Sequence, residues 1–207
     1  MLMLYILLIV IGYFFGSIPV GYIAGRLAGR DIRREGYHRI GASNVFSLLG
    51  FKPAVFVFFG DFFKGIIPIV ILILLGFDES VASIAGLSAI IGHNWPIFLA
   101  FKGEGRGLAT SCGVLYYLLP LETICGFAVF IILAIILKSS PLPAFILACI
   151  VPILALWFPE PLWTFGISLS VSLILVFTRV VGGLKQIEVG QDRKRAILNL
   201  ILYDSVR

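Results

Sequence analysis

The chain has 207 residues, of which 60% are hydrophobic and 13% charged, and its mean hydropathy is +1.08. Water-soluble globular domains carry about 25% charged residues, so a soluble chain of this length could not bury so much apolar surface. The formal net charge is +5. This composition excludes an ordinary soluble domain. It predicts an all-α integral membrane protein, built as a single polytopic domain over residues 1–207.

The chain begins with an uncharged apolar segment, MLMLYILLIVIGYFFGSIPVGYIAG. A cleaved signal peptide has a basic stretch before a shorter apolar core, and no basic stretch precedes this one. We therefore expect a retained first span at residues 3–25. Glycines four residues apart, such as Gly12 and Gly16, predict close helix packing in lipid.

A basic polar loop follows the first span, with the sequence GRDIRREGYHRIGASN at residues 29–44. Basic residues beside a membrane can simply hold the topology or contact anionic headgroups. The GYHRIGASN half is a denser polar cluster than anchoring requires, and GASN can start a helix with Ser43 or Asn44 as its cap. A helix start offers free N–H groups to an anion. The candidate phosphate-binding residues of this loop are Arg39, Ser43 and Asn44.

Further apolar segments are long enough, or nearly so, to cross a hydrocarbon core of about 30 Å. The segment 107–120 is short and glycine-rich and ends at Pro120. It could instead continue as one 107–138 helix, which would leave six spans. The seven candidate spans are 3–25, 52–77, 80–100, 107–120, 121–138, 142–158 and 161–181.

Basic residues are partitioned between the two sides that seven spans would create. Cytoplasmic loops are enriched in Lys and Arg. One side would hold the arginines of residues 26–39, then Lys102 and Arg106, then Lys138 and the basic tail. The opposite turns contain no Lys or Arg, and their charged residues are Asp78, Glu79, Glu122 and Glu160. This partition predicts an N-terminus outside and a C-terminus in the cytoplasm.

Two charged residues lie inside the second span, in the sequence FFGDFFKGIIP. Asp61 and Lys64 are one helical turn apart and can pair along the helix surface. Charges at this depth are costly unless they are paired and turned inward. The pair could link helices structurally or belong to a functional site.

The segment GHNWPIFLAFKGEGRGLAT, residues 92–110, interrupts the apolar chain. Its alternating glycines, Gly103, Gly105 and Gly107, allow a sharp turn whose N–H groups can point at an anion. Lys102 and Arg106 add positive charge, with Arg able to bind two phosphate oxygens. The alternative is a tight turn with two topogenic charges.

A histidine precedes this turn. His93 lies eight residues before Phe101, about 12 Å along a helix, and Pro96 is expected to kink or end that helix. His93 could pack between helices or line a polar cavity. At the other end of the chain, Arg179 could cap the last span or reach the site, and Arg193–Arg195 is typical of a membrane-surface helix.

Together these segments resemble the bacterial acyl-phosphate-dependent glycerol-3-phosphate acyltransferases, which are integral membrane proteins with seven spans. The resemblance covers nearly the whole chain and rests on GSIPVGYIAG, GASNV, DFFKGIIP and GHNWPIFLAFKG followed by GLAT. It implies transfer of a fatty acyl chain from acyl phosphate to the 1-hydroxyl of glycerol 3-phosphate, giving lysophosphatidic acid for phospholipid synthesis. It also implies a bacterial plasma-membrane protein with its site facing the cytoplasm.

An acyl phosphate is already activated, so positioning and charge stabilisation can supply much of the rate without a protein nucleophile. We expect the bilayer as a partner, and no nucleic acid, metal or cofactor. From the residues and the resemblance together, the predicted catalytic residues are His93, Lys102 and Arg106. The predicted phosphate-binding residues are Arg39, Ser43, Asn44, Gly103, Gly105, Gly107, Thr110 and Arg179, with Asp61 and Lys64 as structural or supporting residues.

Three places depart from the family pattern. In the first loop Ser47 occupies the position of a family arginine, Tyr37 that of a serine and Arg39 that of an asparagine, so Arg39 could supply the charge that Ser47 lacks. The basic turn is one residue longer, with Glu104 added and Arg106 in place of lysine. The tail sequence RVVGG keeps Arg179 but lacks the family's histidine and asparagine. A divergent paralogue with another acceptor, or a non-catalytic anion or small-molecule transporter, are therefore alternative interpretations.

Overall fold

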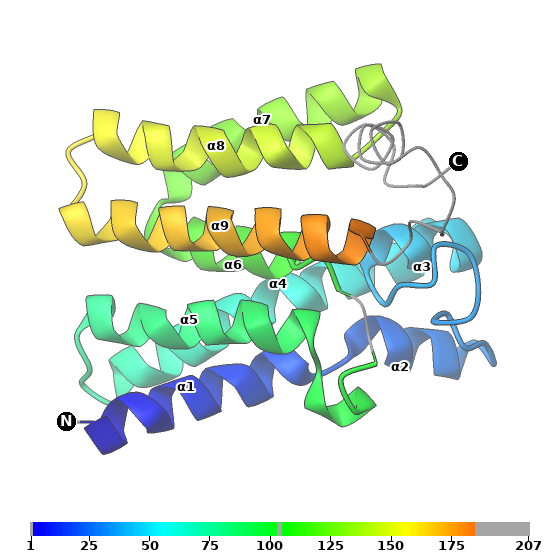
Figure 1. Ribbon diagram of the computed structural model, residues 1–207, viewed down its shortest axis with the longest axis horizontal. Helices are drawn as coiled ribbons and strands as arrows, with labels where there is room; N and C mark the ends of the chain where they lie inside the picture. Colours follow the sequence, from blue (N-terminus) through cyan, green and yellow to red (C-terminus); the bar gives the residue numbers. More distant parts are fainter. Residues whose placement is uncertain (1, 103–104, 185–207) are drawn as a thin grey trace. The chain divides into compact units, whose positions relative to one another are not determined.

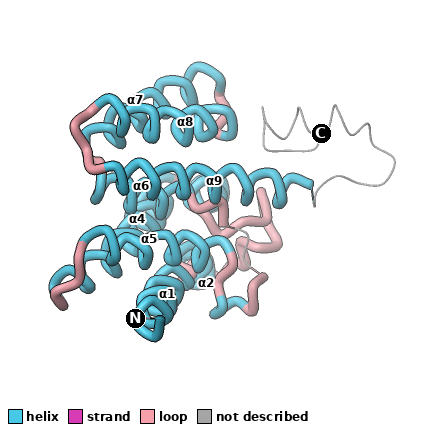
Figure 2. Tube along the Cα trace, turned by 60° about the vertical axis from the view of Figure 1, so that its left-hand side comes forward, coloured by secondary structure: helices cyan, strands magenta, loops and turns pink. Residues whose placement is uncertain are grey.

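The computed structural model describes residues 2–102 and 105–184, and these form helices and loops with no strand among them (Figure 2). The chain divides into two compact units, Met1–Tyr117 and Leu118–Arg207. Each unit is a set of packed helices, and in the first unit a long polar loop joins α2, which ends at Leu27, to α3, which begins at Ala42 (Figure 1). The expected single domain over the whole chain stays a prediction.

The first unit contains most of the residues predicted to carry chemistry. Its helices are α1 (Leu2–Ser17), α2 (Val20–Leu27), α3 (Ala42–Leu49), α4 (Phe51–Leu74), α5 (Glu79–Asn94), the short 3₁₀ helix η1 (Ile97–Leu99) and α6 (Leu108–Leu118).

The predicted first span is two helices rather than one. Helix α1 ends at Ser17 and α2 begins at Val20. Pro19 lies in the break, and proline has no N–H to continue the helical hydrogen-bond ladder. The carbonyl of Ile18 accepts a hydrogen bond from the Val20 N–H at 3.0 Å. The break therefore leaves the Ile18 carbonyl oxygen outside the regular helical hydrogen-bond ladder, within an apolar segment.

Close packing of α1 against α5 confirms the prediction from the spaced glycines. A side chain at Gly12 would collide with the backbone of Ala85, and one at Gly16 with the backbone of Ala89. The Ser88 hydroxyl also donates a hydrogen bond to the Ile9 carbonyl at 2.6 Å. Small residues let the two backbones approach, as is common between helices in lipid, and they fix the height of α5 beside α1.

The GASN sequence starts a helix as predicted, but its expected cap is wrong. Gly41 is the N-cap of α3 and no side chain caps that end. Ser43 and Asn44 are the second and third residues of the helix instead. Glycine is accepted at the N-cap position as well as residues whose side chain caps the helix. The Asn44 side chain has other partners here and is not needed as a cap.

The second unit consists of α7 (Pro120–Leu137), α8 (Pro141–Trp157) and α9 (Leu162–Leu184), with α8 packed against both of the others (Figure 1). Pro120 is the first residue of α7, where its missing N–H has no cost. The alternative of one continuous 107–138 helix is therefore wrong. The Ser172 hydroxyl donates to the Ala148 carbonyl at 2.5 Å and joins α9 to α8.

Five of the seven predicted apolar segments each contain one helix with similar bounds, whereas 3–25 is divided between α1 and α2 and 80–100 between α5 and η1. By length and composition, five of the described segments could cross a membrane: Met3–Leu27, Phe51–Leu74, Glu79–Leu99, Pro120–Leu137 and Leu162–Val181. The shorter apolar helices are Leu108–Leu118 and Pro141–Trp157.

Candidate active site

A buried charged cluster lies in the core of the first unit. The Lys64 ammonium is 2.9 Å from Oδ1 of Asp61, one turn earlier on α4, which confirms the predicted pair. The same carboxylate oxygen is 3.5 Å from Nδ1 of His93 on α5. All three side chains are nearly inaccessible to solvent. Opposite charges within an apolar core are tolerated when they are paired in this way.

The lysine of this cluster also reaches the break in the first span. Its Nζ donates a hydrogen bond to the Ile18 carbonyl at 2.7 Å. The carbonyl is available because Pro19 interrupts the helix, and the ammonium gains a second partner besides Asp61. The cluster thus connects α4, α5 and the α1–α2 break, so the pair does link helices.

His93 stands at the end of its helix. Helix α5 ends at Asn94, followed by Trp95 and Pro96, which confirms the expectation that Pro96 would kink or end this helix, so the helical spacing of about 12 Å does not apply between His93 and Phe101. The residue before a proline is disfavoured in helical conformation, which explains the end. The Tyr13 hydroxyl donates to the Trp95 carbonyl at 2.6 Å and holds this end against α1.

The glycine turn folds back onto the end of α5. A side chain at Gly105 would place its Cβ 2.5 Å from Nε2 of His93. Gly107 adopts a φ of 69°, a conformation that glycine accepts readily. A Cβ there would lie 2.9 Å from the Asn94 side-chain oxygen. The absence of side chains in the turn therefore lets its backbone rest on His93 and Asn94.

Several buried polar groups around this turn lack a hydrogen-bond partner within the described part of the chain. They are Nδ1 of His93, both polar atoms of the Asn94 amide, and the hydroxyls of Thr110 and Ser111, the last two in the first turn of α6. Buried polar groups normally find partners in the protein, in water or in a ligand. Thr110 was predicted from the sequence. Asn94 and Ser111 were missed, although Asn94 directly follows His93 and Ser111 directly follows Thr110.

The other predicted residues of the turn have differing exposure. Lys102 is exposed, Arg106 is half-buried, and both glycines after residue 104 are buried. Gly103 and Glu104 lie outside the described residues. Helix α6 begins at Leu108, directly after the turn, so Arg106 lies two residues before the first N–H groups of the helix. Such a helix start suits an anion.

Asn44 organises the first polar loop from a fully buried position. Its side-chain oxygen accepts a hydrogen bond from the Tyr37 N–H at 2.8 Å. Its amide nitrogen donates to the carbonyls of Ile32 and Arg39 at 2.8 and 2.7 Å and to that of Glu35 at 3.2 Å. The polar atoms of Asn44 are therefore occupied by backbone, whereas Ser43 is exposed and the Arg39 side chain is buried.

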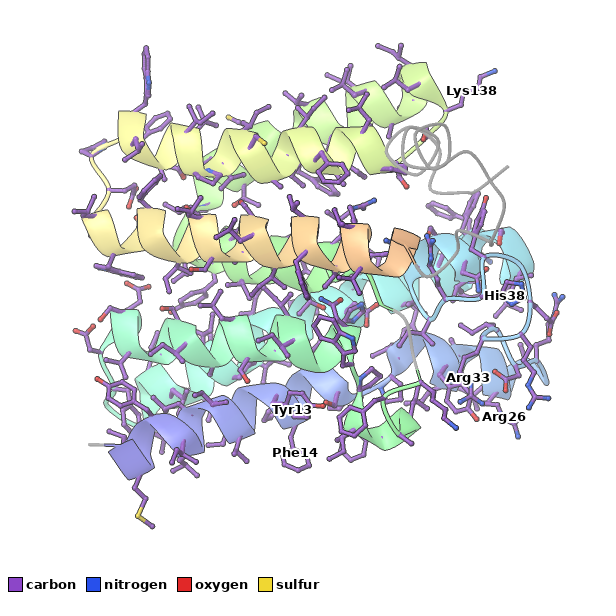
Figure 3. All side chains as sticks on the ribbon, in the orientation of Figure 1. Tyr13, Phe14, Arg26, Arg33, His38 and Lys138 are labelled. Atoms are coloured by element: carbon purple, nitrogen blue, oxygen red, sulfur yellow. The ribbon has the colours of Figure 1, made fainter. Side chains whose placement is uncertain are left out.

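Charged side chains on this loop pair with one another. Arg33 and Asp31 form a bidentate pair, with N–O distances of 2.7 and 2.9 Å, and Arg30 pairs with Glu35. The hydrogen bond from Arg33 lowers the pKa of Asp31 from 3.8 to about 2. Arg33 also lies over the Tyr22 ring at 4.5 Å. Figure 3 shows Arg26, Arg33 and His38 grouped at this end of the unit.

Arg179 belongs to the second unit. It lies on α9, is buried, and its guanidinium carbon is 5.9 Å from the centre of the Phe145 ring on α8. It is therefore not a cap at the end of the helix, because α9 continues to Leu184. The tail residues Arg193–Arg195 lie outside the described residues.

The model of the glycerol-3-phosphate acyltransferase family matches residues 6–187. The chain belongs to this family. Glycerol-3-phosphate acyltransferase 2 of Moorella thermoacetica is 35% identical over 192 residues, covering 92% of this chain and 97% of that protein. The glycerol-3-phosphate acyltransferase of Thermus thermophilus is 32% identical over 186 residues, covering 90% and 92%.

Solved structures of the same family share the fold. The glycerol 3-phosphate form of PlsY (YgiH), an integral membrane glycerol 3-phosphate acyltransferase, superposes with a TM-score of 0.78. It is 29% identical, and the match covers 86% of this chain and 89% of that one. The lysophosphatidic acid form gives a TM-score of 0.75 at 30% identity. The family assignment from GASNV, DFFKGIIP and the GHNWP segment is confirmed.

Proposed function

We propose that this chain transfers a fatty acyl group from acyl phosphate to the 1-hydroxyl of glycerol 3-phosphate, releasing lysophosphatidic acid and inorganic phosphate. The family to which the chain belongs supports the acyltransferase activity. The observation that carries the proposal is the contact between His93 and the Gly105 segment, because it brings a buried imidazole to a basic turn and a helix start.

In the proposed reaction the acceptor hydroxyl oxygen attacks the carbonyl carbon of the acyl phosphate. The bond from that carbon to the phosphate oxygen then breaks, and phosphate leaves. His93 is the candidate to take the hydroxyl proton, since imidazole is the usual base near neutral pH. Arg106 and Lys102 stabilise the negative charge that develops on the carbonyl and phosphate oxygens.

Phosphate binding is proposed for the turn and for the first loop. At the turn, Gly105, Arg106 and Gly107 directly precede α6, and Thr110 lies in its first turn, where N–H groups and the helix dipole favour an anion. At the first loop, Arg39 and Ser43 remain candidates. Asn44 acts there by holding the loop, since its amide is bonded to backbone at four positions.

We also propose that all seven apolar helices span the bacterial plasma membrane, with the N-terminus outside and the site facing the cytoplasm. The one-sided distribution of Lys and Arg supports this orientation. Single cysteines placed at Glu79 and at Lys138, in a chain without its three native cysteines, would test it. An impermeant thiol reagent added to intact cells should label the first position and spare the second.

A phosphate-release assay tests the activity. Purified protein in lipid should release phosphate from acyl phosphate only when glycerol 3-phosphate is present. Replacing Arg106 with Ala should raise the KM for a phosphate-bearing substrate and lower turnover, whereas Lys138→Ala removes an exposed cation from another turn and should change neither. The absence of turnover at every acyl length would overturn the assignment.

The departures from the family pattern favour testing a second acceptor. Ser47 in place of arginine removes a cation from the α3 region, and Glu104 adds an anion to the basic turn. Both changes weaken attraction for a dianionic phosphate. If glycerol 3-phosphate fails as acceptor, the same assay with other polyol phosphates identifies a paralogue with changed specificity. Uptake into vesicles without acyl transfer would instead indicate a transporter.

A further inference from the structure

The end of the first span carries cations that the proposed acyl transfer does not use. The apolar segment Met3–Leu27 has 25 residues, whereas about 20 helical residues cross the hydrocarbon core of a bilayer. The last turn of α2 is therefore expected among the lipid headgroups. Tyr22 and Arg26 belong to this turn, and tyrosine and arginine are both common at that depth.

The Tyr22 ring lies against two guanidinium groups. The guanidinium carbon of Arg33 is 4.5 Å from the ring centre, and that of Arg26 is 6.0 Å from it. Both arginines lie at the same end of the first unit (Figure 3). Such contacts hold an arginine through its flat face and leave its N–H groups for other partners. The ring thus joins a residue of α2 to a residue of the polar loop.

Acidic groups of the loop compensate only part of the positive charge. Residues 26–35 contain four arginines and two carboxylates, which gives a net charge of +2. Asp31 accepts two hydrogen bonds from the Arg33 side chain, and Glu35 pairs with Arg30. The ion pairs therefore neutralise two of the four arginines.

The other two arginines remain available to a partner. Arg26 is exposed and pairs with no carboxylate among the described residues. The side chain of Arg34 is 85% exposed, and its Nε is 4.0 Å from the Asp31 carboxylate, which already accepts from Arg33. A guanidinium can bind two phosphate oxygens at once. This surface therefore suits a phosphate-bearing anion.

Apolar residues of the same helix indicate that the phosphate belongs to a lipid. Ile23 is 44% exposed and Leu27 is 83% exposed, and each directly follows Tyr22 or Arg26 in the sequence. Gly21 and Gly25 form the buried face of α2. A soluble anion would gain nothing from exposed aliphatic side chains. A phospholipid can place its acyl chains against them while its phosphate contacts the arginines.

We propose that the phosphate headgroup of an anionic phospholipid binds at the Tyr22 site, which is formed by Tyr22, Arg26, Arg33 and Arg34. Arg26 binds the phosphate, and Arg34 adds attraction at longer range. The ion pair with Asp31 keeps Arg33 on the Tyr22 ring. The bound lipid also holds the polar loop at the membrane surface, and its binding does not depend on the proposed acyl transfer.

Quenching by labelled lipids in nanodiscs tests the site at its own position. In a chain without its three native cysteines, Leu27→Cys carries a fluorophore. Brominated phosphatidylglycerol or brominated phosphatidylcholine is the quencher, and we expect stronger quenching by phosphatidylglycerol at equal mole fraction. The control position is Leu137→Cys, because Leu137 is an exposed leucine beside one cation, Lys138. The preference for the anionic lipid should be much smaller there.

Substitutions then test which residue binds the lipid. Arg26→Gln should lower the preference for phosphatidylglycerol at residue 27 about fivefold, because it removes one cation and its pair of phosphate contacts. Arg26→Lys keeps the charge and should lose less. Lys52→Gln removes an exposed cation at the start of α4 and should have a smaller effect than Arg26→Gln. High salt should weaken the preference of the parent chain.

Equal preference at residues 27 and 137, or an unchanged preference in Arg26→Gln, would overturn the proposal. Loss of the preference when inorganic phosphate is added, at a concentration too low to alter the ionic strength, would also overturn it, because the site would then bind a soluble anion. Circular dichroism checks the fold of each variant. Arg34→Gln removes charge at a second exposed position and should also lower the preference. None of these measurements requires turnover.

Discussion

The first polar loop and the end of α5 are both rich in polar residues, but they differ in whether their buried polar groups have hydrogen-bond partners. In the loop, Asn44 is bonded to backbone through both ends of its amide, and the charged groups pair with one another. At the end of α5, the Asn94 amide and the Thr110 hydroxyl are equally buried yet have no hydrogen-bond partner among the described residues.

This difference separates polar groups that build the fold from polar groups that are left for a ligand. A satisfied buried group contributes to stability, whereas an unsatisfied one costs free energy until something binds it. The Asp61–Lys64 pair combines both features. Its charged groups are paired with each other and with backbone, as in the loop, but it also contacts His93 at the candidate site. The experiments below test this division.

The largest effect on stability is expected at the buried pair. Lys64→Ala leaves Asp61 in an apolar core without its cation, and the free energy of unfolding should fall by about 3–5 kcal/mol. Unfolding in detergent, followed by circular dichroism, measures the change. Lys52→Ala is the matched control, because Lys52 is an exposed cation on the same helix and should cost less than about 0.5 kcal/mol. Equal losses in the two variants would contradict the prediction.

A smaller but substantial loss is expected when Asn44 is truncated. Asn44→Ala leaves the Ile32 and Arg39 carbonyls and the Tyr37 N–H without their partner, which should lower the free energy of unfolding by about 2–3 kcal/mol. The neighbouring Ser43→Ala, at an exposed position on the same turn of α3, is the comparison. If both variants unfold like the parent, the loop does not depend on Asn44.

At Thr110 stability should be kept or increased while activity falls. Thr110→Val keeps the shape and removes a buried hydroxyl that makes no hydrogen bond within the described residues, so the free energy of unfolding should rise by about 1 kcal/mol. Phosphate release should fall, since this hydroxyl is proposed to bind substrate phosphate. Thr164→Val removes a bonded hydroxyl, 2.6 Å from the Pro161 carbonyl, and should show the reverse. A stability loss without an activity loss at Thr110 would contradict the division.

The smallest effect concerns pH at the exposed end of the loop. The bond from Arg33 holds the pKa of Asp31 at about 2, below its unfolded value of about 3.9. The stabilisation is therefore fully present above about pH 4 and is lost as the pH falls through the folded value. Because both side chains of this pair remain partly accessible to solvent, its contribution is small. The parent chain should be more stable than Asp31→Asn above about pH 4, and this difference in the free energy of unfolding should shrink as the pH falls toward 2. Acid titration of unfolding measures it, and a difference that is the same at pH 2 as at pH 6 would contradict the prediction.

The order and bounds of the helices were predictable because apolar length in lipid leaves few alternatives to a helix. The Asp61–Lys64 pair was predictable for the same reason, since residues three apart on a helix face one another. The break at Pro19 could also have been predicted from the missing N–H of proline, although the uncharged run alone indicated one continuous span.

The remaining contacts depend on how distant segments meet. Asn44 was expected to cap a helix, but its partners lie in a loop whose path no local pattern specifies. The approach of His93 to Asp61 requires α4 and α5 to pack at one particular height. Asn94 was missed because an asparagine next to a histidine has no distinctive pattern in the sequence, and its importance follows only from its burial beside Gly107.

The packing of α1 on α5 also has a consequence for biosynthesis. A ribosome makes α1 first, yet the surface that Gly12 and Gly16 fit belongs to α5, which is made after α2, α3 and α4. An apolar helix forms its backbone hydrogen bonds internally, so α1 can be stable in lipid before α5 is made. During that interval its glycine face is open to any other helix. A second copy of α1 that occupied this face would keep α5 out, and the nascent chain would then lack the support that places His93.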